Sequence, residues 1–460
     1  MNSNYSVTII GGGISGLATA WWLFKSGVDV VVLESDVEVG GTMKTVKENG
    51  WLAETGPNSA LETSPLFQKL FSDLSLNDEV VYPNEIASKR YILRNGNLHA
   101  LPMSPPLFLK SKLWSLKGKL RLLKEPFIGK AEKEESIAEF VERRLGKEFL
   151  DYAINPFVAG VYAGNPEELS VRAAFPKLYA LEEKYGSLIK GQIKGAKERK
   201  KRAEQSKQSA KMFSFKNGMQ VFPCALKKGL KDRVVTSATV NSITKNESGY
   251  TVSGKNNEGR FSVQTDAVIS AIPSFHLSNL LRSFDAQLSR QLDEIYYPPV
   301  TEIFLGYCAE DVRQPLDGFG FLVPAKEERK ILGTIWSSSL FLNRSPEGHV
   351  ALTTFVGGSR QPELAEVGDD QLAKIVTDEL HSLLHTSAPP VFCRIHRWKK
   401  AIPQYRIGHL ALIEKIEEFE RSHPGIFISG NFRGGISVGD CVTASEKTAE
   451  RTKEFLSSKL

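Results

Sequence analysis

The chain has 460 residues, of which 41% are apolar and 24% are charged. This length exceeds what a single hydrophobic core supports, so we expect two or three domains. The composition excludes wholesale disorder, and no apolar run is long enough to predict a membrane-spanning helix. The net charge is +6, and much of it lies in two basic blocks, residues 110–124 and 190–211.

The N-terminal residues lead directly into a predicted strand, which predicts the absence of a signal or transit peptide and a cytosolic location. Four cysteines, Cys224, Cys308, Cys393 and Cys441, are far apart in the sequence. This spacing predicts neither a disulfide framework nor a structural zinc site, and we predict no bound metal.

The first 34 residues have the pattern of a βαβ unit. Residues 7–10 form a short apolar run and predict a buried strand, residues 14–27 predict a helix, and residues 28–34 predict a second buried strand. Farther along the chain, residues 105–215 show helical periodicity, and residues 233–273 alternate β-rich runs with turns, as an antiparallel meander does. Residues 425–456 predict a strand, a glycine-rich turn and a long helix.

The turn of the βαβ unit carries the sequence G-x-G-x-x-G. Gly11 permits a tight turn, Gly13 lets a pyrophosphate approach the backbone, and Gly16 lets the helix pack close to the strand. Glu34 ends the second strand, where an acidic side chain accepts hydrogen bonds from a ribose. In this context the turn predicts a dinucleotide-binding site, with either NAD or FAD as the ligand.

Three further segments favour FAD. The pair Gly40-Gly41 resembles the second flavin fingerprint of the amine-oxidase-like flavoproteins, and residues 265–273 and 428–449 resemble strands and a helix that return to the flavin in that superfamily. A helix that begins just past Gly439 would point its N–H groups at the flavin ring. The resemblance therefore implies non-covalently bound FAD.

Other segments narrow the resemblance. "RYILRNGNLHALP" at 90–102, "GVYAGNPEELSVRAAFP" at 160–176 and "AIPQY" at 401–405 are similar to the oxygen-dependent protoporphyrinogen and coproporphyrinogen III oxidase family. The resemblance runs nearly end to end.

The family's pattern implies an α/β fold with three units. These are a Rossmann-like FAD-binding domain (1–85, 213–280 and 403–460), a mixed-sheet substrate domain (86–104 and 281–402) and an α-helical membrane-binding domain (105–212). It also implies the chemistry, a six-electron oxidation of a porphyrinogen that consumes O₂ and produces H₂O₂ in haem biosynthesis. Ferrochelatase is a candidate partner, and the oligomeric state is left open. The resemblance favours protoporphyrinogen as the substrate over coproporphyrinogen.

The resemblance implies where the substrate binds. Arg90 would pair with a propionate, Leu322 and Phe341 would sandwich the macrocycle, and Gly160 would bring backbone close to it. Ala159 stands where some relatives carry an arginine, so a second carboxylate contact is not assigned. Asn58 either hydrogen-bonds the macrocycle or only holds its own turn, and no catalytic acid–base pair is expected. The flavin-contacting residues implied are Gly11, Gly12, Gly13, Ile14, Ser15, Gly16, Glu34, Ser35, Gly41, Thr42, Gly56, Pro57, Asn58, Ser59, Val240, Asn431, Ile436, Ser437 and Val438.

Residues 107–124 predict one amphipathic helix, with five leucines and Trp114 on one side and cations around the rest. This composition is typical of a helix on an anionic membrane surface, although such a helix could also pack its leucines on the core. With the resemblance it predicts peripheral attachment to the inner face of the cell membrane. Residues 194–211 of the second basic block have no apolar face and predict a solvated segment, and nucleic-acid binding is not expected.

Two rival functions stay open from the sequence. One is another enzyme of the same superfamily, an amine oxidase or a carotenoid desaturase. The other is a non-catalytic escort protein with a flavin fold, which would lack tightly bound flavin.

Overall fold

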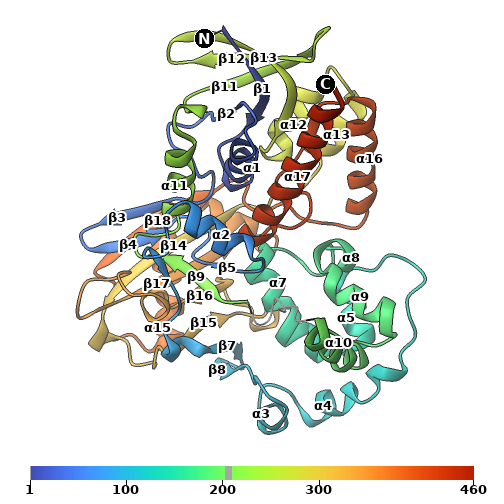
Figure 1. Ribbon diagram of the computed structural model, residues 1–460. Helices are drawn as coiled ribbons and strands as arrows, with labels where there is room; N and C mark the ends of the chain where they lie inside the picture. The colour runs from blue at the N-terminus through green and yellow to red at the C-terminus, as the bar shows by residue number, and fades with distance from the viewer. Residues whose placement is uncertain (1, 203–209, 460) are drawn as a thin grey trace.

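The computed structural model of the protein describes residues 2–202 and 210–459, arranged in three units (Figure 1). A first sheet with its helices forms one end of the molecule. A second sheet and a group of helices lie beside each other at the other end. Of the second basic block, residues 203–209 lie outside the described residues.

The first sheet begins with the predicted βαβ unit. Strand β1 (Asn2–Ile10) leads into α1 (Ile14–Lys25), and β2 (Val30–Leu33) returns parallel to β1. All four residues of β2 are buried, as their unbroken apolar run predicts. The predicted elements are confirmed here, with β1 starting earlier than residue 7.

Strands from distant segments complete this sheet in the order β10-β2-β1-β13-β12-β11, with β19 beside β13. The predicted meander is confirmed for β11, β12 and β13, which are antiparallel, whereas β10 pairs in parallel with β2. β13 is long enough to pair with β12 through its first half and with β19 through its last three residues. The strands are β10 (Val234–Val235), β11 (Thr239–Lys245), β12 (Tyr250–Asn256), β13 (Gly259–Ser270) and β19 (Ile426–Ile428).

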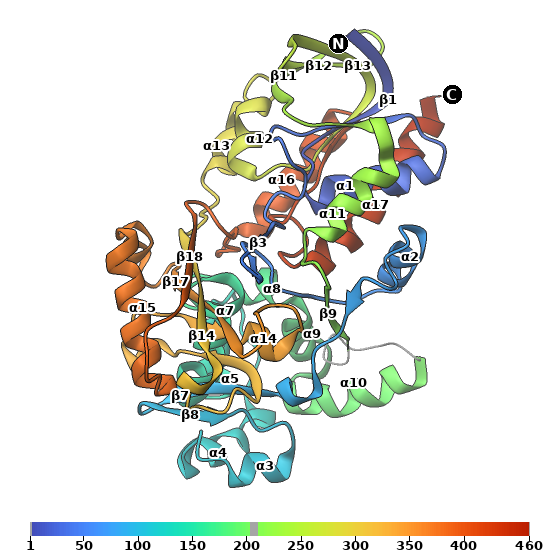
Figure 2. The same cartoon turned by 90° about the vertical axis from the view of Figure 1, so that its left-hand side faces the viewer.

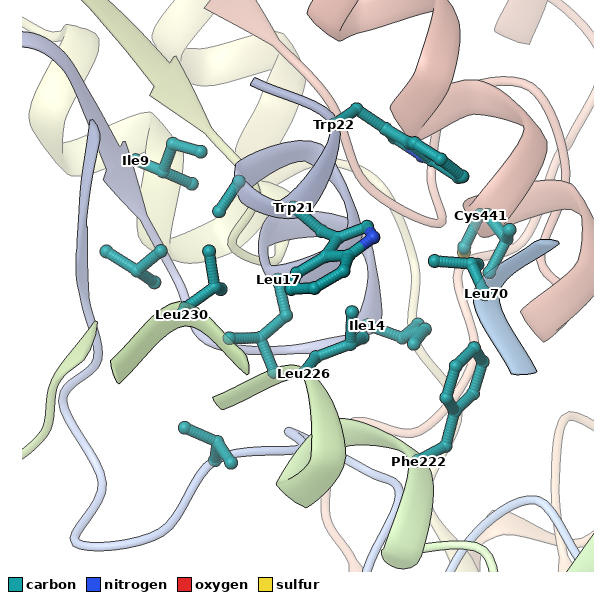
Figure 3. Close-up of a cluster of buried hydrophobic side chains, with 14 of the residues drawn as sticks. Ile9, Ile14, Leu17, Trp21, Trp22, Leu70, Phe222, Leu226, Leu230 and Cys441 are labelled. Carbon is teal, nitrogen blue, oxygen red and sulfur yellow. The ribbon is translucent and has the colours of Figure 1, made fainter. Parts of the chain in front are cut away.

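Helices cover this sheet on both faces. α1 packs between the sheet and the C-terminal helix, and Trp21 and Leu17 face Leu226 and Leu230 of α11 (Figure 3). The covering helices are α2 (Leu66–Asp73), α11 (Val221–Leu230), α12 (Ser274–Leu281), α13 (Ala286–Asp293), α16 (His409–Ser422) and α17 (Val438–Lys459).

The second sheet has the order β18-β14-β17-β16-β15-β7-β8. It is mixed, because β15 and β7 run parallel and the other neighbours are antiparallel. One face is closed by α15 (Asp369–Leu384), whose leucines pack on Ile303, Leu305 and Tyr307. The strands are β7 (Lys89–Arg94), β8 (Asn97–Ala100), β14 (Val300–Cys308), β15 (Gly318–Leu322), β16 (Gly333–Ile335), β17 (His349–Gly357) and β18 (Phe392–Trp398), with α14 (Ser337–Leu340) between β16 and β17.

Short strands join the two sheets. The hairpin of β3 (Thr45–Glu48) and β4 (Trp51–Glu54) packs Trp51 against Phe304 and Phe392 of the second sheet. β9 (Met212–Phe215) pairs with both β5 (Ala60–Leu61) and β6 (Val80–Val81).

The helical unit, residues 105–202, confirms the predicted helical character. Its helices are α3 (Pro105–Lys110), α4 (Leu116–Leu122), α5 (Ile137–Arg144), α6 (Lys147–Phe149), α7 (Asn155–Tyr162), α8 (Val171–Ala174), α9 (Pro176–Tyr185) and α10 (Leu188–Arg202). Within the described residues, no helix combines the length and the apolar content needed to cross a membrane.

The prediction of one helix over 107–124 is wrong. The chain leaves the helical conformation at Ser111 and begins a new helix with Ser115, whose side chain accepts the N–H of Gly118. Between them, Leu113 and Trp114 turn into the core, where Trp114 stacks on Phe149 at 4.9 Å between ring centroids. The break allows these two apolar residues to be buried, which a continuous surface helix could not do.

Candidate flavin and substrate site

The glycine-rich turn has the geometry that a dinucleotide phosphate needs. Gly11 has φ of +106°, and a Cβ on Gly16 would overlap the carbonyl oxygen of Gly11, so both positions require glycine. At Gly13, by contrast, no described protein atom lies within 4 Å of where a Cβ would be. Helix α1 starts at Ile14 with no side-chain cap and no acidic residue in its first turn. Its N–H groups and this open space fit a pyrophosphate.

Glu34 holds the neighbouring backbone in place. Its Oε2 accepts the N–H of Gly12 at 2.5 Å, and its Oε1 accepts the N–H of Asp36 at 2.8 Å and the hydroxyl of Ser35 at 3.1 Å. A carboxylate offers about four acceptor positions, so one position stays for a ribose hydroxyl. The Glu34 carbonyl accepts the N–H of Ala238, two residues before the predicted Val240, which is half-buried on β11.

The second fingerprint rests directly on the first. The N–H of Gly40 donates to the carbonyl of Gly12 at 2.9 Å, and a Cβ on Gly41 would lie 3.5 Å from the Cα of Gly13. A Cβ on Gly56 would overlap the carbonyl oxygen of Thr42, which brings the Gly56–Ser59 turn against this fingerprint. Several predicted flavin residues from separate segments therefore lie together.

Asn58 holds its own turn. Its Nδ2 donates to the carbonyl oxygen of Gly56 at 3.1 Å, which is one of the two roles considered for it. Pro57 and Ser59 beside it are half-buried. The turn is also fixed from the second sheet, because Trp398 Nε1 donates to the carbonyl of Thr55 at 2.5 Å.

The C-terminal loop is shaped by Tyr405 of the "AIPQY" segment. Its hydroxyl donates to the carbonyl of Asn431 at 2.5 Å and accepts the N–H of Gly435 at 3.0 Å. Helix α17 then starts at Val438, two residues before the predicted start, and the Ser437 hydroxyl accepts the N–H of Asp440. Its first N–H groups fit an electron-rich ring edge. Ile436 packs on the helical unit.

Two of the predicted substrate residues meet between α7 and β15. A Cβ on Gly160 would lie 2.5 Å from a methyl group of Leu322, so only glycine permits this approach. Phe157 and Val161, three residues before and one after Gly160 on α7, are exposed apolar side chains that the sequence reasoning missed. The two residues are four apart in the sequence, on either side of Gly160, and this helical spacing could have indicated that they share a face of the helix. Together these residues offer an apolar wall.

Arg90 and Phe341 lie in different surroundings. Arg90 is exposed at the start of β7, with its guanidinium 5.9 Å from the ring centroid of Phe319, and it makes no ion pair with any described carboxylate. Phe341 is buried in a small cluster with Ala87 and Leu340. The structure thus leaves Arg90 accessible to an anion, whereas contact of Phe341 with a ligand stays a prediction.

Two buried carboxyl groups lie close to the Gly56–Ser59 turn. Burial raises the pKa of Glu54 to about 7, although it accepts hydrogen bonds from Thr45 and Met219 and faces Arg344 at 3.8 Å. Burial and the charge of Glu54 raise the pKa of Glu302 well above its usual value. Sequence reasoning missed Glu302, although an acidic residue inside the apolar run of β14 was a visible signal.

Comparison with known proteins agrees with this geometry. Residues 14–452 match the family of flavin containing amine oxidoreductases. The chain is 36% identical to protoporphyrinogen oxidase 2 of Arabidopsis thaliana, over 99% of this chain and 95% of that protein. It is 27% identical to coproporphyrinogen III oxidase of Bacillus subtilis (strain 168), over 98% of both chains.

The crystal structure of a candidate protoporphyrinogen oxidase from Exiguobacterium sp. 255-15 has the same fold. It superimposes with a TM-score of 0.81 at 24% identity and covers 99% of both chains. The family match and the 36% identity both extend over nearly the whole chain, and together they assign the chain to a family. The chain belongs to the flavin-containing amine oxidoreductases, in the branch that contains the protoporphyrinogen oxidases.

Proposed function

We propose that the protein binds FAD and oxidises protoporphyrinogen IX to protoporphyrin IX, with O₂ as the electron acceptor and H₂O₂ as the second product. The observation that carries this proposal is the position of Arg90, an exposed cation beside the aromatic ring of Phe319. It lies on the same sheet as Leu322, which forms the apolar wall with Gly160 of α7. A flat apolar macrocycle with carboxylates on one edge complements both features. The names of the similar proteins support the same substrate class.

When bound, the flavin supplies a two-electron oxidation, taking a hydride from a methylene bridge of the macrocycle. The protein's own residues bind and orient the macrocycle and the flavin. Arg90 pairs with a propionate, for which a guanidinium is well shaped, and the apolar wall excludes water from the macrocycle. The N-termini of α1 and α17 provide N–H groups for the pyrophosphate and for the flavin ring.

Anaerobic mixing with a porphyrinogen tests the proposal. The purified protein should be yellow, lose its flavin absorbance when a porphyrinogen is added, and regain it in air as porphyrin fluorescence appears. A protein without flavin would favour the escort-protein alternative. A flavin that only an amine or a carotenoid precursor reduces would favour the other enzyme classes.

The same assay separates the two porphyrinogens. Protoporphyrinogen carries two propionates and coproporphyrinogen four, and one anchoring arginine, Arg90, suits the substrate with fewer carboxylates. We expect a higher kcat/KM for protoporphyrinogen. A much higher value for coproporphyrinogen would assign the chain to that substrate instead.

Replacing Arg90 with alanine should raise KM about tenfold and change kcat little, because the ion pair forms in the ground state and persists during oxidation. Steady-state kinetics with the preferred porphyrinogen measure both constants. Arg313→Ala removes another exposed arginine of the same unit and serves as the control. An unchanged KM for Arg90→Ala would disprove the propionate contact.

We also propose that the protein attaches to the inner face of the cell membrane through α3 and α4. These helices lie at the end of the molecule opposite the two chain termini (Figure 1, Figure 2). Several apolar side chains are exposed there, and Leu116 and Phe127 are 74% and 87% exposed. The exposed lysines nearby suit anionic headgroups. The apolar side chains are Met103, Leu107, Leu109, Leu116, Leu120, Leu123 and Phe127, and the lysines are Lys110, Lys112, Lys117 and Lys124.

Changing Leu116, Leu120 and Leu123 together to serine should lower binding to anionic lipid vesicles at least tenfold, since each removes exposed apolar surface from the contact. Co-sedimentation measures the bound fraction. The control is Leu342→Ser, which changes a leucine of equal exposure, 74%, outside the helical unit. Equal binding by the triple variant and the wild type would refute the proposed contact.

A further inference from the structure

An acidic and an imidazole side chain face each other across two strands of the second sheet. Glu302 of β14 pairs with His396 of β18 in the antiparallel register. Residues opposite each other in such a pair have their Cβ atoms about 4.5–5.5 Å apart and on the same face. The two side chains therefore lie within reach of each other, although 94 positions separate them in the sequence.

Each of the two side chains has a buried polar atom without a hydrogen-bond partner. These atoms are Oε2 of Glu302 and Nε2 of His396, and neither has a partner among the described residues. Leaving a buried polar atom unpaired is unfavourable, because the atom has lost its hydrogen bonds to water. Two such atoms on neighbouring positions indicate a site that is completed by a ligand or by an exchanged proton.

The pair lies close to both the flavin turn and the apolar wall. Trp398, two residues after His396, is the one that donates to the carbonyl of Thr55. Val300, two residues before Glu302 and on the same face, packs in a cluster with Ala159, the neighbour of Gly160. Val300 and Trp398 are themselves opposite each other in the register, so the Gly56–Ser59 turn and the substrate wall both approach the sheet two residues along the strands from the pair.

Charged groups around the pair set its protonation. Glu54 of β4 faces Glu302, and Arg344 in turn faces Glu54. Burial is the main cause of the raised pKa of Glu302, so its carboxyl group stays protonated into the range where ordinary carboxyl groups are ionised.

The imidazole is held neutral by its own surroundings. Burial lowers the pKa of His396, and the nearby charges of Arg394, on the same strand, and of Lys44 lower it further. A neutral imidazole can accept or donate one hydrogen bond beside the carboxyl group without adding a buried charge.

We propose that Glu302 accepts the proton that the substrate loses, and that His396 is the positioning residue that orients its carboxyl group. This inference rests on the proposed function. The step uses the ionised fraction of Glu302, which grows as the pH rises. A pyrrole N–H bond breaks, its electron pair stays in the macrocycle, and the proton moves to a carboxylate oxygen of Glu302. The hydride leaves the methylene carbon with its own electron pair, and the flavin of this family is the oxidant. Atoms and charge balance, and the stored proton is available when O₂ is reduced to H₂O₂.

The first test needs no turnover. Glu54 has a pKa of about 7, so it is ionised at higher pH. In the oxidised, flavin-loaded protein at such a pH, the infrared C=O band of a protonated carboxylic acid should persist and should come from Glu302. It should disappear in Glu302→Gln and persist in Glu54→Gln. A band that survives in Glu302→Gln, or that is lost only in Glu54→Gln, overturns the assignment.

The second test follows flavin reduction by a porphyrinogen in a stopped-flow instrument. In the wild type the rate should rise with pH as Glu302 becomes ionised. Glu302→Gln, which keeps the size of the side chain, should lower the rate about 100-fold and remove this pH dependence. The exposed Glu310→Gln is the control, and His396→Asn should lower the rate while the pH dependence persists at a shifted midpoint.

The outcomes separate the two proposals. An unchanged rate and pH profile in a flavin-loaded Glu302→Gln variant overturns the proton step while the proposed function stands. If no porphyrinogen reduces the flavin of the wild type, the proposed function is overturned, and the proton step with it. In that case the infrared result still decides whether Glu302 is a buried, protonated acid.

Discussion

Gly13→Ala should remove tight flavin binding and leave the folded protein as stable as the wild type. Gly13 has φ of −73° and ψ of 177°, which alanine adopts without strain, and no described protein atom lies within 4 Å of the new Cβ. The methyl group would instead occupy the space proposed for the pyrophosphate. We expect the purified variant to be colourless, with at least a tenfold weaker affinity for added FAD.

Two other glycines are controls for this result. In Gly16→Ala the Cβ would overlap the carbonyl oxygen of Gly11, so that variant should lose stability as well as flavin. In Gly129→Ala nothing lies near the Cβ and the backbone is unstrained, so neither property should change. Thermal unfolding of the apoprotein and fluorescence titration with FAD measure the two properties separately. If Gly13→Ala still bound a full complement of flavin, the pyrophosphate would not lie beside Gly13 and the prediction would be wrong.

Arg144→Ala should lower the free energy of unfolding by about 3–5 kcal/mol, because it leaves the buried Glu125 without its cation and Glu182 with Arg143 alone. Arg144 is fully buried, and its guanidinium contacts Glu182 at 2.5 Å and Glu125 at 3.2 Å. Glu125 also accepts the N–H groups of Leu188 and Ile189 at the start of α10. The network thus joins α5, α9 and α10 at one point.

Urea unfolding followed by tryptophan fluorescence tests this expectation. Glu125→Gln added to Arg144→Ala should recover part of the lost stability, since it removes the uncompensated charge. Lys374→Ala breaks an exposed pair with Asp378 and should change stability by no more than about 0.5 kcal/mol. If Arg144→Ala lowered the free energy of unfolding as little as Lys374→Ala, the buried network would contribute nothing to stability.

The parts of the fold that could be predicted from the sequence are those with local causes. The βαβ unit depends on neighbouring residues, and an apolar run, three glycines and Glu34 were enough to predict it. The flavin segments could be recognised because each resembles a known pattern by itself. Their packing, such as Gly56 against Thr42, became visible only in the structure.

The parts that could not be predicted depend on residues distant in the sequence. The leucine spacing of 107–124 fits one helix, but Glu148 accepts the N–H and the hydroxyl of Ser115 and so fixes the break. No residue near Ser115 in the sequence indicates that Glu148 is its partner. Likewise, nothing in the sequence connects Glu302 with His396, and only the register of β14 and β18 joins them.

The pairing of β13 with β1 has a consequence for synthesis on the ribosome. Residues 2–10 of the nascent chain have their partners at residues 262–270, and β19 adds the last strand of this sheet at residues 426–428. At translation rates of about 5–20 residues per second, the apolar edge of β1 waits on the order of tens of seconds for its neighbour. During that interval, β2 can pair with only one edge of β1, and the edge that later pairs with β13 stays open. We therefore expect newly made chains to depend on chaperones until β13 has emerged, and truncation before β19 to yield aggregates.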